Sequence, residues 1–204
     1  MAFPAFFAEV PRITVHDGLA RLLGASDDGT IEYGYEDVVR LAGHSCPTVA
    51  GAWLMTLQAL QALYPDGTPE RGEIDVRFAD EATRGVTGVI ANVVGLVTGA
   101  TTDTGFKGLA GRHDRRHLMH FNADIPGEIT FTRRDTGAAV AVSFSAQAIP
   151  GSPEAMPLLQ KMLSGQATEE EGRQFGALWQ DRVRRILTAP AQAGLVTVSP
   201  LQAA

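Results

Sequence analysis

The residues of this sequence best suited to chemistry are a histidine and a thiol two positions apart, His44 and Cys46, within Gly43-His44-Ser45-Cys46-Pro47. Gly43 is a natural helix terminator and Pro47 is favoured at the first position of a helix, so an extended segment between two helices is expected. Side chains two apart in an extended segment point to the same side. Imidazole and thiol can therefore act together, and the start of the second helix favours the thiolate form of Cys46.

Two kinds of site use this pair. Thiolate and neutral imidazole are preferred ligands of zinc and related divalent metals, so the residues predict a divalent transition-metal site, with zinc the first choice. The same residues also suit a metal-free thiol enzyme in which Cys46 is the nucleophile and His44 is its base. Taken alone, a His-x-Cys pair is more often a buried cysteine beside an ordinary loop histidine.

A metal at His44 and Cys46 needs further ligands. The chain has one cysteine, so a structural zinc site of three or four cysteines is impossible within it, and histidine, carboxylate, water or a second subunit must complete the set. The candidates are His16, His113, His117, His120, Asp37, Asp80 and Glu81. His113, His117 and His120 would share a face if their segment were helical. We expect a strand at 118–121 instead. The alternative to metal ligation is that these are ordinary surface histidines.

Several periodic segments must hold the pair in position. A helix over 31–42 is expected to stop at Gly43, and the helix from Pro47 carries apolar residues at one-face spacing until a turn at 65–67. The spacing of apolar residues further predicts a strand at 74–78, a helix at 86–97, a glycine- and threonine-rich loop at 98–111, and a hairpin formed by 129–131 and 140–144.

The C-terminal quarter is predicted to be helical. Thr168 and Glu171 form a capping box before an apolar stripe over 175–187. The tail after Pro190 is low in charge and is expected to fray in part. The predicted fold class is α+β, with a small, mostly antiparallel sheet packed with helices and a helical C-terminal extension.

The composition narrows the class of protein. With 204 residues, of which 45% are hydrophobic and 20% charged, the chain suits one globular domain. A net charge of −6 opposes general nucleic-acid binding. A single cysteine suggests a reducing compartment, and the N-terminus lacks the basic region of a secretory signal, so a cytoplasmic protein is expected. The most apolar window, 85–100, is too short to span a membrane.

The pentapeptide at 43–47 followed by an apolar helix resembles the opening motif of the FmdE family, which is named after formylmethanofuran dehydrogenase. The resemblance continues at 85–86, 96–99, 105–108 and 134–137 and spans roughly residues 36 to 146. It implies an α+β fold, commonly dimeric, with a metal at the histidine and cysteine of the motif. It implies no established reaction.

Some positions depart from the family pattern. Ala42 stands where many relatives have histidine, Thr48 stands where glycine is common, and the further cysteines that relatives carry near Thr83 or Arg84 and at Ala100 are absent. The missing thiols favour an open coordination position, which fits catalysis or ligand capture better than structural support.

Cationic residues could serve an anionic substrate. Lys107 lies in the glycine-rich stretch and matches the Gly-Lys element of the family, and Arg115 and Arg116 could form an anion clamp; solvated charges are the alternative in each case. The sequence lacks both the Walker loop and the dinucleotide fingerprint, so no nucleotide cofactor is predicted.

These features divide the chain into an FmdE-like α+β domain at 1–150 and a helical extension at 151–204, packed on the same domain or on a dimer partner. The functional hypothesis is a metal-binding protein, either a metal-dependent enzyme or a metal-handling protein, that acts on a small molecule and forms a homodimer. The alternatives are a thiol-based enzyme and a non-catalytic accessory module that docks to a larger redox or metalloenzyme. Neither nucleic acid nor a membrane is an expected partner.

Overall fold

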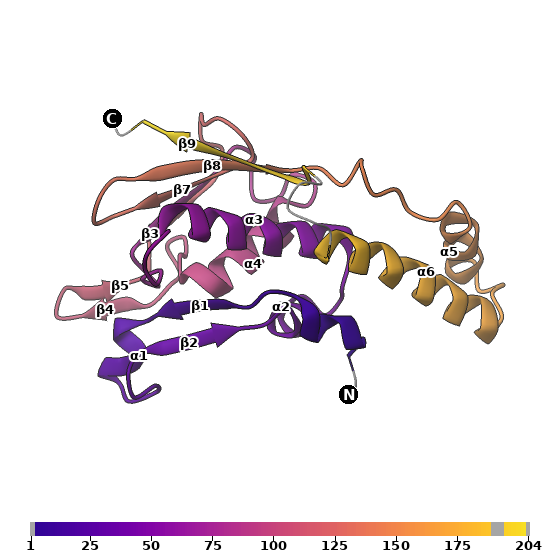
Figure 1. Cartoon of the computed structure of the whole chain (residues 1–204), viewed down its shortest axis with the longest axis horizontal. Helices are drawn as coiled ribbons and strands as arrows, with labels where there is room; N and C mark the ends of the chain where they lie inside the picture. Colours follow the sequence, from indigo (N-terminus) through magenta and orange to yellow (C-terminus); the bar gives the residue numbers. More distant parts are fainter. Residues whose placement is uncertain (1–2, 189–193, 203–204) are drawn as a thin grey trace.

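The protein has a layered body from which a helical arm projects. The computed structural model describes residues 3–188 and 194–202. A five-stranded sheet forms one layer, two helices form the middle, and a two-stranded sheet with short helices forms the third (Figure 1). The middle layer consists of α3 (Pro47–Leu63) and α4 (Thr87–Thr98), and the third contains η1 (Ala5–Glu9), β1 (Ile13–His16), α1 (Gly18–Leu22), β2 (Thr30–Tyr33) and α2 (Tyr35–Ala42).

The large sheet is mixed. Its strands are, in spatial order, β6 (Met119–His120), β3 (Ile74–Phe78), β7 (Ile129–Arg133), β8 (Ala139–Phe144) and β9 (Val196–Leu201). Four of them run antiparallel, but β6 lies parallel to β3, with Val76 opposite Met119. The α+β class is confirmed, whereas the expected mostly antiparallel sheet acquires a parallel edge. The reason is the crossover through α4, which returns the chain to β3 in its original direction.

The core lies between this sheet and α3. Ile74, Val76 and Phe78 alternate with polar residues and are at most 2% exposed, so the predicted period-two strand is confirmed. The predicted helix from Pro47 is also confirmed, and Trp53 on it is completely buried. Gly51 leaves room for the Phe144 ring, with which any Cβ would collide. Burial on both sides explains why α3 is apolar around most of its surface.

Two local predictions were wrong. Residues 30–33 form β2, which pairs with β1, so the helix predicted from 31 begins only at Tyr35. The loop predicted over 98–111 contains β4 (Lys107–Leu109), which pairs with β5 (Arg112–Asp114) across the turn Ala110–Gly111. Within the tail that was expected to fray in part, the described residues contain β9, which pairs with β8 over six residues, and 189–193 and 203–204 lie outside the described residues. In each case strand pairing outweighs local sequence preference.

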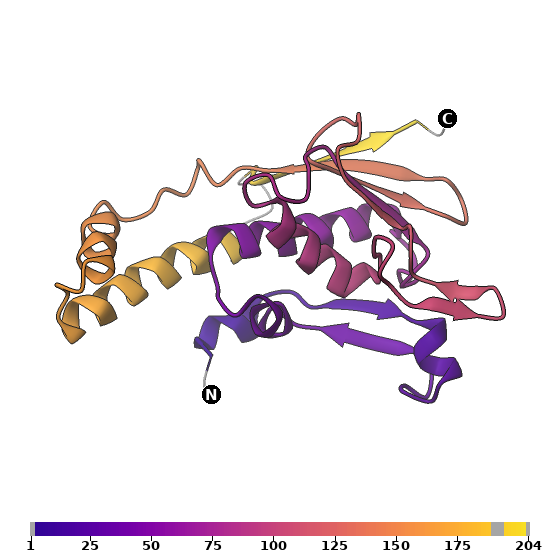
Figure 2. The ribbon, with the colours of Figure 1, turned by 180° about the vertical axis from the view of Figure 1, so that it is seen from behind.

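The C-terminal extension predicted at 151–204 contains two helices, α5 (Ala155–Leu163) and α6 (Glu169–Leu187), but it ends in β9, which belongs to the large sheet. The Thr168 and Glu171 capping box is present. Val183, Ile186 and Leu187 are buried near the end of α6, which packs against α3. The beginning of α6 and all of α5 extend beyond the body, as both ribbon views show (Figures 1 and 2). None of the helices in the described ranges has the length and hydropathy needed to cross a bilayer.

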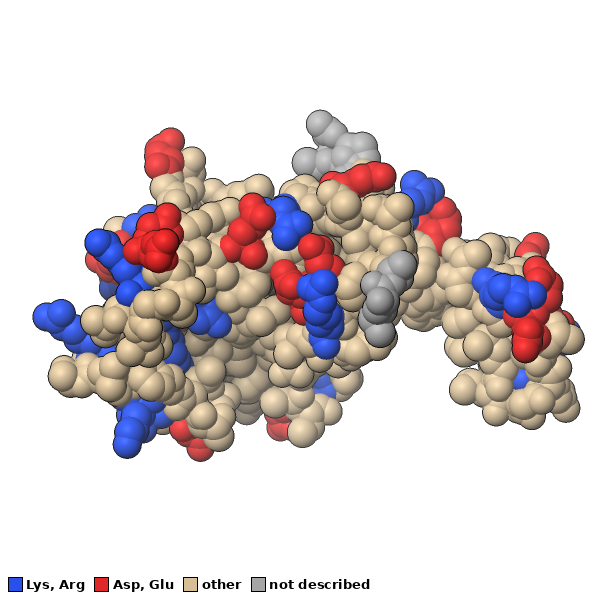
Figure 3. Space-filling view, turned by 90° about the horizontal axis from the view of Figure 1, so that it is seen from below, with Lys and Arg blue, Asp and Glu red and all other residues tan. Residues whose placement is uncertain are grey.

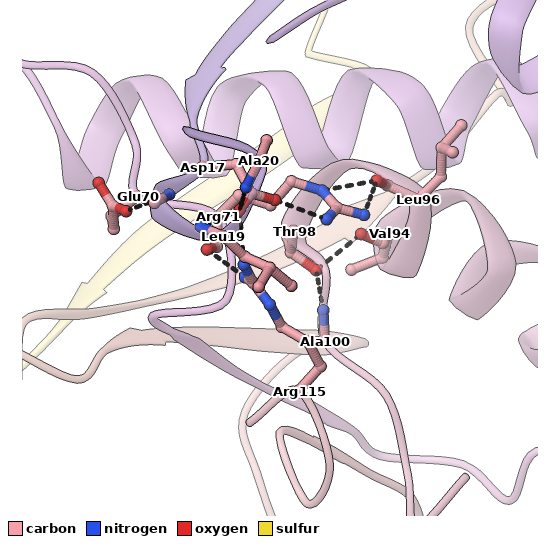
Figure 4. A network of polar contacts seen from close by, with 11 residues as sticks. Asp17, Leu19, Ala20, Glu70, Arg71, Val94, Leu96, Thr98, Ala100 and Arg115 are labelled. Atoms are coloured by element: carbon pink, nitrogen blue, oxygen red, sulfur yellow. Dashed lines mark hydrogen bonds and ion pairs between the residues drawn. The ribbon is translucent and has the colours of Figure 1, made fainter. Parts of the chain in front are cut away.

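A buried ionic cluster joins the third layer to the rest of the body. In this cluster, which we call the Asp17 network, Asp17 binds Arg71 Nη1 through Oδ2 at 2.9 Å and Arg115 Nη2 through Oδ1 at 2.7 Å (Figure 4). Oδ1 also accepts hydrogen bonds from the backbone amides of Leu19 and Ala20, and so caps α1. Arg71 donates to the Leu96 carbonyl near the end of α4. One carboxylate therefore connects four separate segments.

The surroundings of Asp17 have opposing effects on its ionisation. Burial raises the pKa of Asp17, but the hydrogen bonds from Arg71 and Ala20 and the charges of Arg115 and Arg71 outweigh burial. The pKa of Asp17 consequently lies below its ordinary value, and the carboxylate is ionised at neutral pH.

We expect Asp17→Ala to lower the free energy of unfolding by about 3–5 kcal/mol at pH 7, because it leaves the 5%-exposed Arg115 without its carboxylate. Urea denaturation measures this loss. Asp135→Ala, which removes an exposed ion pair with Arg133, should lose at most about 1 kcal/mol. Since the folded pKa of Asp17 is lowered, its contribution is present above the unfolded value of about 3.9 and is lost as the pH falls through the folded value. Equal losses in the two variants at pH 7 would contradict a stabilising role of the network.

Candidate functional site

The His44 and Cys46 segment is held between two helix ends. α2 terminates at Gly43, whose φ of 74° is left-handed and suits glycine, and the Gly43 amide donates to the Val39 carbonyl at 2.9 Å. Cys46 then has extended φ and ψ angles of −148° and 170° and caps α3, which begins at Pro47. The structure confirms the predicted boundaries of both helices at this segment.

The Cys46 thiol lies against the first turn of α3. Its Sγ accepts a hydrogen bond from the Val49 amide at 3.5 Å, and the side chain is half-buried. Cys46 therefore caps the first turn of α3 through its sulfur atom.

The His44 ring is exposed and has one fixed nitrogen. Nδ1 lies 3.0 Å from the Ala42 carbonyl oxygen. Because that oxygen can only accept, Nδ1 must carry the proton, and the neutral ring then keeps its lone pair on Nε2. Histidines that ligate metals are commonly oriented in this way, with the second nitrogen donating to a carbonyl or carboxylate.

Ser45, between the two side chains, anchors the segment to distant elements. Its hydroxyl contacts the Tyr35 hydroxyl at 3.1 Å. Its carbonyl accepts from Trp179 Nε1 at 3.0 Å and from Gln180 Nε2 at 3.1 Å, both on α6. Burial raises the pKa of Tyr35, so this hydroxyl remains protonated at neutral pH. The helical arm is thus tethered at its root to the backbone of the motif.

The anchoring residues Trp179 and Gln180 were not recognised from the sequence. Trp179 belongs to the apolar stripe predicted on this helix, which indicated packing rather than a hydrogen bond. A separation of 134 residues between Trp179 and Ser45 leaves no local signal of the contact.

Four of the other candidate metal ligands already have partners. His16 Nδ1 lies 2.5 Å from Glu70 Oε2, and His120 Nε2 lies 3.1 Å from Asp75 Oδ2. Asp37 caps α2 through the Gly34 amide and pairs with Arg40, and Asp80 pairs with Arg84.

The remaining candidates are scattered. Glu81 and His117 are exposed, and His113 lies on β5 beside Gly18. Residues 112–120 form two strands and a turn, so the helical arrangement of three histidines does not occur. Across 3–188 and 194–202, no three His, Cys, Asp or Glu side chains gather in a metal-binding group. Among the described residues, neither His44 nor Cys46 therefore belongs to a group of three side chains that could hold a metal.

The predicted cationic residues have three different environments. Lys107 is exposed at the start of β4 and forms no ion pair within the described part of the chain. Arg116 pairs with Asp114 at 2.7 Å. Arg115 is buried in the Asp17 network, so the prediction of an anion clamp or a solvated charge was wrong for this residue. A buried guanidinium held by an internal carboxylate is not available to a substrate.

Comparison with known families identifies a matching family. Residues 41–195 match the family described as "FmdE, Molybdenum formylmethanofuran dehydrogenase operon". The matched region contains the motif, α3, α4, most of the large sheet and the helical arm, whereas β1, α1 and β2 precede it. Comparison with curated proteins finds none that matches the chain.

The capping role of Cys46 can be separated from its chemistry. Serine is a favoured capping residue and alanine is not, so Cys46→Ala should be about 1 kcal/mol less stable than Cys46→Ser. Urea unfolding of the two variants measures this difference. If alanine were as stable as serine, the contact between Cys46 and the Val49 amide would not stabilise the helix.

Proposed function

The chain belongs to the FmdE family. On that basis we propose that it is a metal-binding protein in which His44 and Cys46 ligate a divalent transition metal, with zinc as the first candidate. We further propose that it acts on a small molecule, as a metal-dependent enzyme or a metal-handling protein. The description of the family associates it with formylmethanofuran dehydrogenase genes.

The orientation of His44 carries the proposal. Its Nδ1 donates a hydrogen bond to the Ala42 carbonyl, which leaves the lone pair of Nε2 free to bind a metal. The half-buried Cys46, two positions along the chain, carries the sulfur. One imidazole nitrogen and one thiolate form a donor set that suits zinc and its neighbours in the transition series. The tether of Ser45 to Trp179 would hold the backbone between the two ligands, which reduces the ordering that binding requires.

A metal held by two side chains keeps positions for water, substrate or further protein ligands. Bound zinc would supply Lewis acidity, which supports hydrolytic or lyase-type chemistry. His44 and Cys46 would hold and orient the ion, and the Ala42 carbonyl would fix the tautomer of the imidazole.

Elemental analysis tests the metal site in protein purified without a His tag or chelator. Wild type should contain about one divalent metal per chain, and Cys46→Ser and His44→Ala should lose it. His117→Asn is a matched control, because His117 is an exposed histidine with a left-handed backbone (φ 59°) that asparagine also tolerates. It should retain the metal. A metal-free wild type that gains none from zinc, iron, nickel or cobalt would overturn the proposal.

A metal-free thiol enzyme is the second candidate, and the Val49 amide directed at Cys46 Sγ favours it. In this case the metal-free protein should react with iodoacetamide quickly at neutral pH, and His44→Ala should slow the reaction. Equal alkylation rates in wild type and His44→Ala would exclude His44 as the base or charge partner of the thiol.

The arm gives reason to expect a second copy of the chain as the partner. Met156, Met162 and Leu163 on α5 are 56%, 40% and 80% exposed, an apolar group that lies beyond the body. α6 packs against α5 and also contacts the motif through Ser45, so a partner that covers the whole arm could also reach His44 and Cys46 and supply the missing ligands. The alternative occupant is a larger redox or metalloenzyme, with the chain as its accessory module.

Light scattering during size-exclusion chromatography tests the dimer. Wild type should elute with twice the chain mass, and the double substitution Met156→Asp with Leu163→Asp should shift it to the monomer, because buried carboxylates oppose an apolar contact. Leu23→Asp, at a leucine 62% exposed on the opposite end of the body, should remain dimeric. A monomeric wild type would leave the accessory role as the better account of the arm.

A further inference from the structure

We propose that the hollow between α1 and the β4–β5 hairpin binds a small organic anion with an apolar chain, such as a medium-chain carboxylate. This site is separate from the proposed metal site. α1 and the β4–β5 hairpin lie at the end of the body opposite to the helical arm (Figures 1 and 2), whereas Ser45, between His44 and Cys46, accepts hydrogen bonds from the arm helix α6.

The hollow has the size of a small-molecule site. Its volume is about 760 Å³, within the range typical of ligand pockets. α1 contributes Gly18, Arg21 and Leu22, and the hairpin contributes Leu109, Arg112 and His113. The α1 part precedes the region that matches the family, so the hollow combines a segment outside the match with one inside it.

The two arginines of the hollow are unusual in this protein because neither pairs with a carboxylate among the described residues. Apart from Arg182, which donates to the Ile149 carbonyl, every other arginine forms an ion pair. Seen from below, basic side chains project at the left, the end that holds α1 and the hairpin (Figure 3). Two free guanidiniums at one hollow favour an anionic ligand.

Three carboxylates near the hollow form their contacts with groups other than Arg21 and Arg112. Glu70, close to Gly18, binds His16 and accepts the Gly18 amide at 3.2 Å. Asp114 on the hairpin pairs with Arg116, and Asp17 belongs to its own network. Arg21 and Arg112 therefore remain free to bind an external carboxylate.

The walls of the hollow are apolar. Leu22 is 59% exposed and lies on α1 beside Arg21, and Leu109 is 45% exposed on β4, opposite Arg112 on β5. Exposed leucines beside unpaired guanidiniums form an amphipathic surface, on which an aliphatic chain can be covered while its carboxylate receives charge-assisted hydrogen bonds. An anion without an apolar part would contact the arginines of this surface but would leave the leucines uncovered.

The hairpin is also held in an unfavourable backbone conformation. Ala110 and His113 have positive φ angles of 49° and 59°, which L side chains rarely adopt. Gly18 lets the His113 ring approach closely, since a Cβ there would lie 3.1 Å from His113 Cε1. Packing of His113 on α1 thus fixes one wall of the hollow.

Titration calorimetry with octanoate tests the proposal, with acetate and 1-octanol as probes of the headgroup and chain alone. Octanoate should bind at least about tenfold more tightly than either. Arg21→Gln and Arg112→Gln should each weaken octanoate binding about fivefold or more, and Arg173→Gln, an exposed arginine on the arm, should leave it unchanged. Leu109→Asn should also weaken it, with Leu41→Asn as the matched control, because Leu41 is a similarly exposed leucine (48%) that does not line the hollow.

Circular dichroism of each variant separates loss of binding from loss of fold. The proposal is overturned if octanoate does not bind, if octanol binds equally well, or if the Arg21→Gln and Arg112→Gln double variant keeps the wild-type affinity. Cys46→Ser protein should bind octanoate as wild type does, so the result does not depend on whether His44 and Cys46 hold a metal.

Discussion

The rest of the fold depends on one buried carboxylate between two guanidiniums. Asp17, only 3% exposed, joins the N-terminal hairpin to Arg71 before the large sheet and to Arg115 after α4. Without it, the buried guanidinium of Arg115 and the partly buried one of Arg71 would lose their shared counter-charge, so the contact favours assembly of these segments together. The Leu96 carbonyl accepts from Arg71, which adds the end of α4 to the same cluster. The network consequently fixes the position of α1 and of the chain that leaves the β4–β5 hairpin.

A second, smaller constraint acts at the other end of α3. The Ser45 carbonyl receives two hydrogen bonds from α6 while the Cys46 sulfur caps the helix, so the motif and the arm cannot move independently without breaking these contacts. α3 has 17 residues, so its ends are about 25 Å apart at 1.5 Å per residue. One end of the body is therefore held by the ion pairs of the Asp17 network, and the other end is held by side-chain hydrogen bonds to the Ser45 carbonyl.

The sequence predicted what depends on neighbouring residues. The capping of α3 by Cys46, the termination of α2 at Gly43 and the alternation in 74–78 all follow from local rules. The Asp17 network could not be predicted in this way, because Asp17 and Arg115 are 98 positions apart. The parallel pairing of β6 is similarly long-range, and a strand of two residues carries no periodicity. For the candidate site, the positions of His44 and Cys46 were predictable, but the anchors Trp179 and Gln180 were not.

The scarcity of ligands around the motif follows from how the other acidic and histidine side chains are used. Asp37 is committed to capping α2, Asp80 and Arg84 form a pair, and His120 binds Asp75. Each of these contacts stabilises an element of the body, so recruiting such a side chain to a metal would disrupt that element. We infer that a metal at His44 and Cys46 must draw its further ligands from water, a substrate or another chain. Coordination would then respond to the arrival of that molecule, which a closed four-ligand structural site could not do.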